Sequence, residues 1–265
     1  MSEASVLELS EANARFRLEE ALSYADAEGD LGARARATAT ASHRTLGICN
    51  LLRYASVDGF ACALAKAGDA RLDQLHRAFT TGSCPPALLC SGNDLGFTAA
   101  VAAGAEATAA AIAELAPTEA LRDVEYEDDF LWQRTLQLLL LGRDDEVRGA
   151  VERWRTLLDG EPSGQLDACT AVLDGDEDAF RDGFAHLLRQ RTAQLERYRT
   201  SLTFSAERFA TEGRIYVDGL AVLRLAEARG VRMRESAEMV PELARVPRGL
   251  RLPARGSWRL VDPLS

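Results

Sequence analysis

The chain has 265 residues, of which 47% are hydrophobic, and this is enough apolar material for one large domain or two small ones with a sizeable core. That apolar content, with a charged fraction of 27%, excludes a chain that is disordered by composition. The formal net charge of −10 argues against a general nucleic-acid binder, which needs a basic face, and suits a protein that meets a basic protein partner.

The N-terminus and the apolar stretches predict a cytoplasmic protein with no membrane contact. Residues 1–30 are acidic and amphipathic, and they lack the basic start and the uninterrupted apolar centre of a signal peptide. The run Leu136–Leu141 is broken by Gln137 and is too short to cross a bilayer.

Alanine and leucine dominate the composition, and alternating runs of Val, Ile and Thr are nearly absent, which predicts an all-α fold. Apolar periodicity and the glycine and proline stops predict the helices in chain order. They are expected at about 3–28, 43–66, 70–79, 94–115, 130–141, 146–158, 165–173, 177–200 and 213–231, with one more turn or two within 235–245.

Some helix ends carry specific signals. Ser42 is a candidate N-cap for the second helix, and Asp144 or Asp145 for the helix over 146–158. Asp174, with Glu177 three residues later, resembles a capping box at the start of the long helix over 177–200. At the end of 213–231, Gly230 is expected in a left-handed cap with Val231 packing back on the helix.

Together these elements predict an irregular array of antiparallel helical hairpins. The motif LGRDDEVRGAVERW gives the array a loose likeness to tetratricopeptide repeats, but there is no strict repeat period. We expect a single helical domain over residues 1–245, with a possible sub-boundary in the loop 80–94. Residues 246–265 are expected to form an extended basic tail, folded back on the acidic body, in which Trp258 can dock.

The sequence lacks the usual catalytic motifs: we find no nucleophile elbow, phosphate loop, dinucleotide fingerprint or paired-histidine zinc helix. The histidines His43, His76 and His186 are isolated, which predicts surface or capping roles and no metal site. Cys84 and Cys90 flank a proline-rich loop, where they pack, pair with each other or supply a nucleophile; packing is the favoured reading. No cofactor is expected.

The most unusual charge feature is an acidic segment, DVEYEDD, which comprises Asp123, Glu125, Tyr126, Glu127, Asp128 and Asp129. Acidic residues before a helix stabilise its dipole, which explains Asp128 and Asp129 without any function. A second reading is a contact patch for a basic protein, with Tyr126 as an aromatic anchor. A catalytic carboxylate pair is the least favoured reading, because no partner residue accompanies it.

A group of arginines also stands out, formed by Arg189, Arg191, Arg197 and Arg199 in the long helix. These side chains can contact nucleic acid, but they more often solvate a helix face and pair with a neighbouring carboxylate such as Glu196.

The region from about Glu127 to Leu243 resembles the Immunity protein 49 family of bacterial polymorphic toxin systems. The residues that carry the resemblance are FLWQRTLQLLLLGRDDEV, LDGDEDAFRDGFAHLL, IYVDGLAVLRLAEARGVRM and the following EMVPEL. The resemblance implies an all-helical cytoplasmic protein, encoded beside a toxin, that binds and blocks this toxin and has no chemistry of its own.

We therefore expect a non-enzymatic immunity protein that neutralises a toxin by steric and electrostatic block, the toxin being a basic nuclease in the reading that its acidity favours. The acidic segment is the expected toxin-binding site. The alternative is a helical scaffold or regulatory interaction module without a toxin partner. A third reading is an enzyme that uses Cys84 or the acidic segment.

Overall fold

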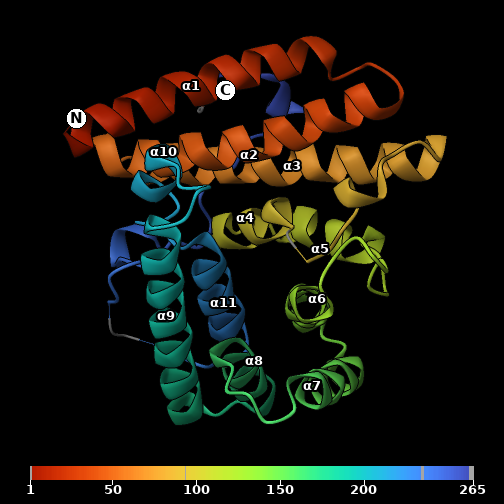
Figure 1. Ribbon diagram of the computed structural model, residues 1–265, viewed down its shortest axis with the longest axis vertical. Helices are drawn as coiled ribbons and strands as arrows, with labels where there is room; N and C mark the ends of the chain where they lie inside the picture. Colours follow the sequence, from red (N-terminus) through yellow and green to blue (C-terminus); the bar gives the residue numbers. More distant parts are fainter. Residues whose placement is uncertain (1, 93, 234–235, 263–265) are drawn as a thin grey trace.

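The computed structural model describes residues 2–92, 94–233 and 236–262, and within these ranges its regular structure is helical (Figure 1). The expected all-α fold is therefore confirmed. The α-helices are α1 (Glu3–Tyr24), α2 (Gly29–Tyr54), α3 (Val57–Thr81), α4 (Leu95–Ala103), α5 (Glu106–Leu115), α6 (Glu127–Leu141), α7 (Asp144–Leu158), α8 (Gly164–Asp174), α9 (Glu177–Arg199), α10 (Ala206–Ala210) and α11 (Val217–Ala228).

The helices form an array in which consecutive elements pack against each other. In Figure 1 the long helices α1, α2 and α3 run across the top of the view, with α4 and α5 beneath them. The pairs α6–α7 and α8–α9 continue the array downward as hairpins, and α11 returns to pack against α4, α6 and α8. The main hydrophobic cluster accordingly draws residues from α2 through to Val246.

The expected helices over 43–66 and 70–79 were wrong, and residues 70–79 are the C-terminal part of α3. The chain does not form a helix over 43–66 that begins at Ser42; instead α2 runs to Tyr54, and the chain turns at Ala55, whose φ of 49° is left-handed. Ser56 then caps α3 by accepting a hydrogen bond from the backbone N–H of Gly59 at 3.1 Å. The apolar pattern continues across this turn because both helices bury their faces in the same core, so periodicity alone misses the break.

The alanine-rich stretch is also two helices, because Gly104 adopts a left-handed φ of 77° between α4 and α5. The expected close packing of this stretch is present. A Cβ added at Gly68 of α3 would lie 2.6 Å from the Cβ of Ala100 in α4. Small residues on both helices therefore permit a short distance between the helix axes.

Two further helix starts differ from expectation. The cap of α9 is Asp176 rather than Asp174, and its carboxylate accepts hydrogen bonds from the backbone N–H groups of Asp178 and Ala179 at 3.0 and 2.9 Å. The residue before α7 is Arg143, and no side chain caps that helix. The end of α11 is as predicted: Gly230 has a φ of 85°, and Val231 is buried and donates its N–H to the carbonyl of Ala226.

The C-terminal segment folds back on the N-terminal helices as expected. Trp258 is buried in a second, smaller hydrophobic cluster with side chains of α1, α2 and α3. Its carbonyl oxygen lies 2.7 Å from Nε2 of the buried His43, and Arg259 binds Asp26. His43 is thus a core residue, so the expectation of a surface or capping role was wrong for it.

A buried cation joins the two halves of the array. Arg44 of α2 is 1% exposed and forms ion pairs with Glu212 at 2.8 Å and with Asp218 of α11 at 3.1 Å. It also donates to the hydroxyl of Thr98 in α4 at 2.9 Å. Burial raises the pKa of Asp218, but the Arg44 guanidinium and the hydrogen bond from Thr98 overcome this effect and hold the pKa below its usual value.

None of the helices, within the residues that the structure describes, has the length and apolar character needed to cross a membrane.

Replacement of Arg44 by methionine is expected to lower the free energy of unfolding by about 3–5 kcal/mol, because two carboxylates would then face each other in the interior without a cation. Urea unfolding followed by circular dichroism measures this change. Arg148→Met removes an exposed pair with Asp174 and should cost less than about 1 kcal/mol. Equal losses in the two variants would contradict the assignment of Arg44 as the central contact.

The protein is expected to lose stability below neutral pH through His43. Burial lowers the pKa of this imidazole to about 4, whereas the unfolded chain has a histidine pKa of about 6.5. The unfolded state therefore binds the proton more readily between these values, and stability falls by about 2 kcal/mol from pH 7 to pH 5. Urea unfolding at pH 7 and pH 5 measures this loss of unfolding free energy. The loss should be about 2 kcal/mol smaller in His43→Gln than in the wild-type chain. His76→Gln, which alters an exposed side chain, is the control and should leave the loss unchanged.

Candidate toxin-contact surface

The acidic segment, residues 123–129, lies in the turn before α6 and in the first turn of that helix. Asp123 has a left-handed φ of 62° in the turn, and Tyr126 directly precedes the helix with 78% of its surface exposed. Glu127, Asp128 and Asp129 occupy the first helical turn, where carboxylates stabilise the helix dipole. The reading as helix-start chemistry therefore applies to these three residues.

Two of the carboxylates have structural partners. Glu125 accepts hydrogen bonds from the backbone N–H groups of Leu121 at 2.9 Å and Gly92 at 2.7 Å, so it ties the segment to the loop before α4. Glu127 forms an ion pair with Arg153 of α7 at 2.6 Å. Neither side chain is free to meet a partner without first giving up these contacts.

Asp123, Asp128 and Asp129 form no ion pair with any residue that the structure describes, and all three are exposed. Desolvation raises the pKa of Asp129, and the negative charges of Asp128 and Glu125 raise it further. The segment therefore carries negative charge that the chain itself does not neutralise. Chemically, this arrangement with Tyr126 beside it fits the binding of a cationic protein surface.

The three histidines do not converge on one site. Nδ1 of His186 lies 3.2 Å from a carboxylate oxygen of Asp167, His76 is exposed and His43 is buried. Within the described ranges, no group of three or more His, Cys, Asp or Glu side chains has the geometry to hold a metal ion. Burial raises the pKa of the Cys84 and Cys90 thiols, which are free and half-buried, and a raised pKa lowers the thiolate fraction that a nucleophile needs.

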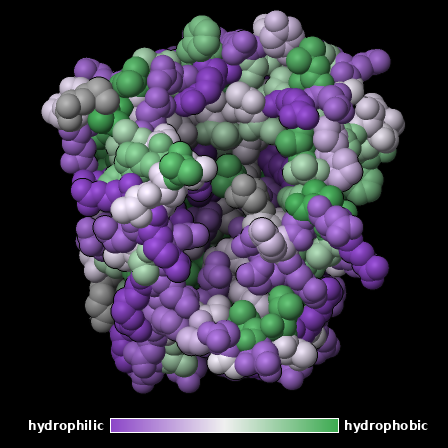
Figure 2. Space-filling model, in the orientation of Figure 1, coloured by the Kyte–Doolittle hydropathy of each residue, from purple (hydrophilic) through white to green (hydrophobic). Residues whose placement is uncertain are grey.

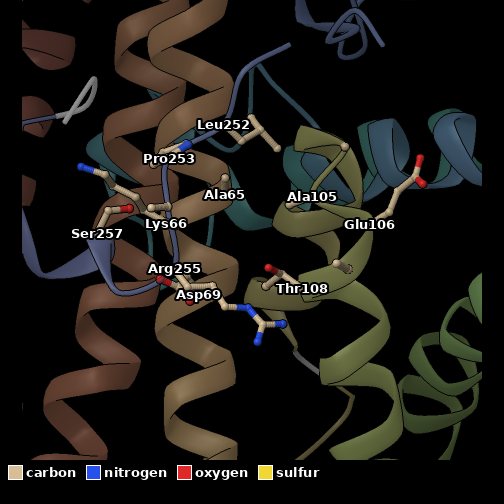
Figure 3. A pocket seen from close by; sticks show the side chains of 13 residues that line it. Ala65, Lys66, Asp69, Ala105, Glu106, Thr108, Leu252, Pro253, Arg255 and Ser257 are labelled. Atoms are coloured by element: carbon tan, nitrogen blue, oxygen red, sulfur yellow. The ribbon is translucent and has the colours of Figure 1, made fainter. Parts of the chain in front are cut away.

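A cavity of about 430 Å³ lies between α3, the start of α5 and the C-terminal segment (Figure 3). Its charged groups mostly hold the tail in place. Asp69 accepts a hydrogen bond from the backbone N–H of Gly256 at 2.6 Å, and the Lys66 ammonium donates to the carbonyl of Leu260 at 3.1 Å. Among the described residues that line it there is no histidine or cysteine.

A second, more open cavity of about 550 Å³ lies over the hairpin of α8 and α9. Four aspartates line it together with His186, Arg155 and Arg189; they are Asp167, Asp174, Asp176 and Asp182. Asp176 serves the cap of α9, and Asp174 and Asp167 pair with Arg148 and His186, so most of these carboxylates already have partners.

The exposed surface is mostly hydrophilic and is hollowed near the centre of the face shown in Figure 2. The segment between α5 and α6, which contains the acidic residues before the helix, lies on the right in Figure 1. On the left, the turn before α10 exposes two large apolar side chains, Leu202 and Phe204. The fully exposed Leu202 lies in that turn.

The family model described as Immunity protein 49 matches residues 34–244, which extends the likeness well beyond the C-terminal half that carried it in the sequence. No curated protein and no solved structure matches the chain.

Proposed function

The chain belongs to the Immunity protein 49 family, and from this premise we propose that it binds and neutralises a toxin protein of a bacterial polymorphic toxin system. The observation that carries the proposal is the match of the family model over residues 34–244 of a 265-residue chain. The proposed mode of action is stoichiometric binding in the cytoplasm without chemistry on the toxin. A buried active site is not needed for this, because a helical array offers a broad exposed surface for protein contact.

The proposed contact includes the exposed part of the acidic segment: Asp123, Tyr126, Asp128 and Asp129. Unpaired carboxylates on the surface of an acidic protein speed its association with a basic partner and select against acidic ones. A basic nuclease fits this chemistry, since its substrate-binding face must attract phosphates. Tyr126 adds an exposed aromatic ring of the type that often dominates binding energy at an interface.

The chain is expected to rescue cells from the toxin. Co-expression of the full chain with the toxin encoded beside its gene should restore growth that the toxin alone abolishes, and a mixture of the chain with a catalytically inactive toxin should elute from a sizing column as one complex. Growth arrest despite co-expression, together with separate elution of the two proteins, would contradict the proposed function. If the chain and the toxin elute separately and the chain instead binds peptides in an extended groove, the scaffold reading is favoured.

The negative charge of the acidic segment is expected to strengthen binding to the toxin. The double variant Asp128→Asn, Asp129→Asn should bind the inactive toxin about tenfold more weakly at low salt, with a smaller loss of affinity on adding salt, because two unscreened attractions are removed. Isothermal titration calorimetry measures both effects. The matched control is Asp145→Asn, Asp182→Asn, which removes the same charge from exposed positions on α7 and α9. Equal affinities of the two double variants would remove the acidic segment from the interface.

A further inference from the structure

The C-terminal end of α9, the turn that follows it and α10 form a compact unit, residues 197–209, that we call the arginine–aromatic tip. Three aromatic rings pack together in it. The ring of Phe204 lies with its centroid 5.7 Å from that of Tyr198 and 5.8 Å from that of Phe209, both at tilted angles. Such tilted pairs are the favourable arrangement for aromatic rings, so the tip has a small core of its own.

Hydrogen bonds fix the turn at the end of this unit. The phenol oxygen of Tyr198 accepts the backbone N–H of Ser205 at 2.8 Å, and the hydroxyl of Ser201 donates to the carbonyl of Tyr198 at 2.8 Å. The backbone N–H of Phe204 donates to the carbonyl of Ser201 at 3.2 Å. The turn therefore holds Leu202 in a defined position, where its side chain is completely exposed.

The tip is also anchored to the rest of the protein. Glu207 of α10 accepts a hydrogen bond from the side-chain amide of Asn13 in α1 at 2.6 Å and pairs with Arg17. Glu212, just after α10, binds the buried Arg44. The backbone that carries Leu202 is therefore already held in place before a partner covers it, which reduces the ordering cost of binding.

The arginines of the tip have no carboxylate partner among the described residues. Arg208 lies over the ring of Tyr198 at 5.3 Å, and Arg199 over the ring of Phe209 at 6.0 Å. With Arg197, these side chains form no ion pair among the residues that the structure describes, and the expected pairing with Glu196 is absent there. In a chain with a net charge of −10, the tip is thus a local concentration of unneutralised positive charge.

We propose that this tip is a second toxin-contact surface, which inserts Leu202 into an apolar hollow on the toxin whose rim carries carboxylates for Arg199 and Arg208. The inference rests on the proposed function and names a different part of the chain from the acidic segment. An apolar side chain with polar groups around it matches the layout of an interface, whose centre is apolar and whose rim is polar, and arginine is enriched at such interfaces.

The observations favour a protein surface over nucleic acid as the occupant. The aromatic faces of the tip already contact each other or an arginine, so they are not open for stacking with bases. A fully exposed leucine also has no role in reading a phosphate backbone. An apolar hollow with an acidic rim satisfies both the leucine and the arginines.

In Figure 1 the turn before α10 and the segment before α6 lie on opposite sides of the view, and Figure 2 shows a hollow near the centre of the same view. A toxin seated over this face would meet positive charge on one flank and negative charge on the other. Such a two-signed surface fixes the orientation of a partner as well as attracting it.

The test measures binding of the full chain to the inactive toxin by isothermal titration calorimetry. Leu202→Asp should weaken the affinity by about tenfold or more, because it places a charge in an apolar hollow with an acidic rim. The matched control Leu157→Asp changes an exposed leucine at the end of α7 and should alter the affinity by less than about twofold. Arg199→Gln combined with Arg208→Gln should weaken binding about fivefold or more, with a reduced salt dependence.

The outcomes separate the two proposals. If the wild-type chain binds and the Leu202 and arginine variants bind equally well, the tip inference fails while the proposed function stands. If the wild-type chain does not bind, both fail. Thermal unfolding of each variant checks that the tip remains folded, and the milder Leu202→Ala variant should still lose affinity. Binding of a 30-base-pair DNA duplex at physiological salt that the arginine variant loses would overturn the inference in favour of nucleic acid.

Discussion

The buried guanidinium of Arg44 is the contact on which the arrangement of the helices depends. A cation with 1% of its surface exposed is tolerable only when its charge and its hydrogen bonds are all met. Here Thr98 of α4 meets them together with Glu212 and Asp218, which lie at and just before the start of α11. This requirement fixes α11 against α2 and α4. Because α11 also packs against α6 and α8, the same contact sets how the N-terminal layer and the later hairpins meet.

The constraint extends from the core to the proposed binding surfaces. Glu212 follows α10 directly, so the pairing with Arg44 holds the base of the arginine–aromatic tip in place. On the other flank, Glu125 joins the acidic segment to the backbone of Gly92, in a loop that a second buried pair, between Arg71 and Asp94, holds just before α4. Each exposed group that we assign to toxin binding therefore stands on a fixed support, and pre-organisation of this kind reduces the entropy lost on association.

Local signals predicted the helical class, the Gly230 cap and the docking of Trp258, because composition, a left-handed glycine and an isolated apolar residue each act over a few residues. The turn at Ala55 and the break at Gly104 were missed, since the core pattern runs on through both. In the acidic segment, no local pattern separates Glu125 and Glu127 from the unpaired Asp128 and Asp129, because the partners Gly92 and Arg153 lie far away in the chain. The tip was missed for a similar reason: Tyr198, Phe204 and Phe209 form a unit only once the turn folds.

Asp218 belongs to the stretch IYVDGLAVLRL, which carried the resemblance to the family. Its carboxylate forms an ion pair with the buried Arg44, so its role is structural. The stretch that carried the resemblance is thus part of the support, and the toxin contact that we propose lies on exposed residues elsewhere.

The most direct test is a titration of the toxin's activity with the purified chain. Binding without chemistry predicts a linear loss of activity that ends at one equivalent of chain per toxin. Complete inactivation by a small fraction of an equivalent, or full activity at an excess, would contradict it.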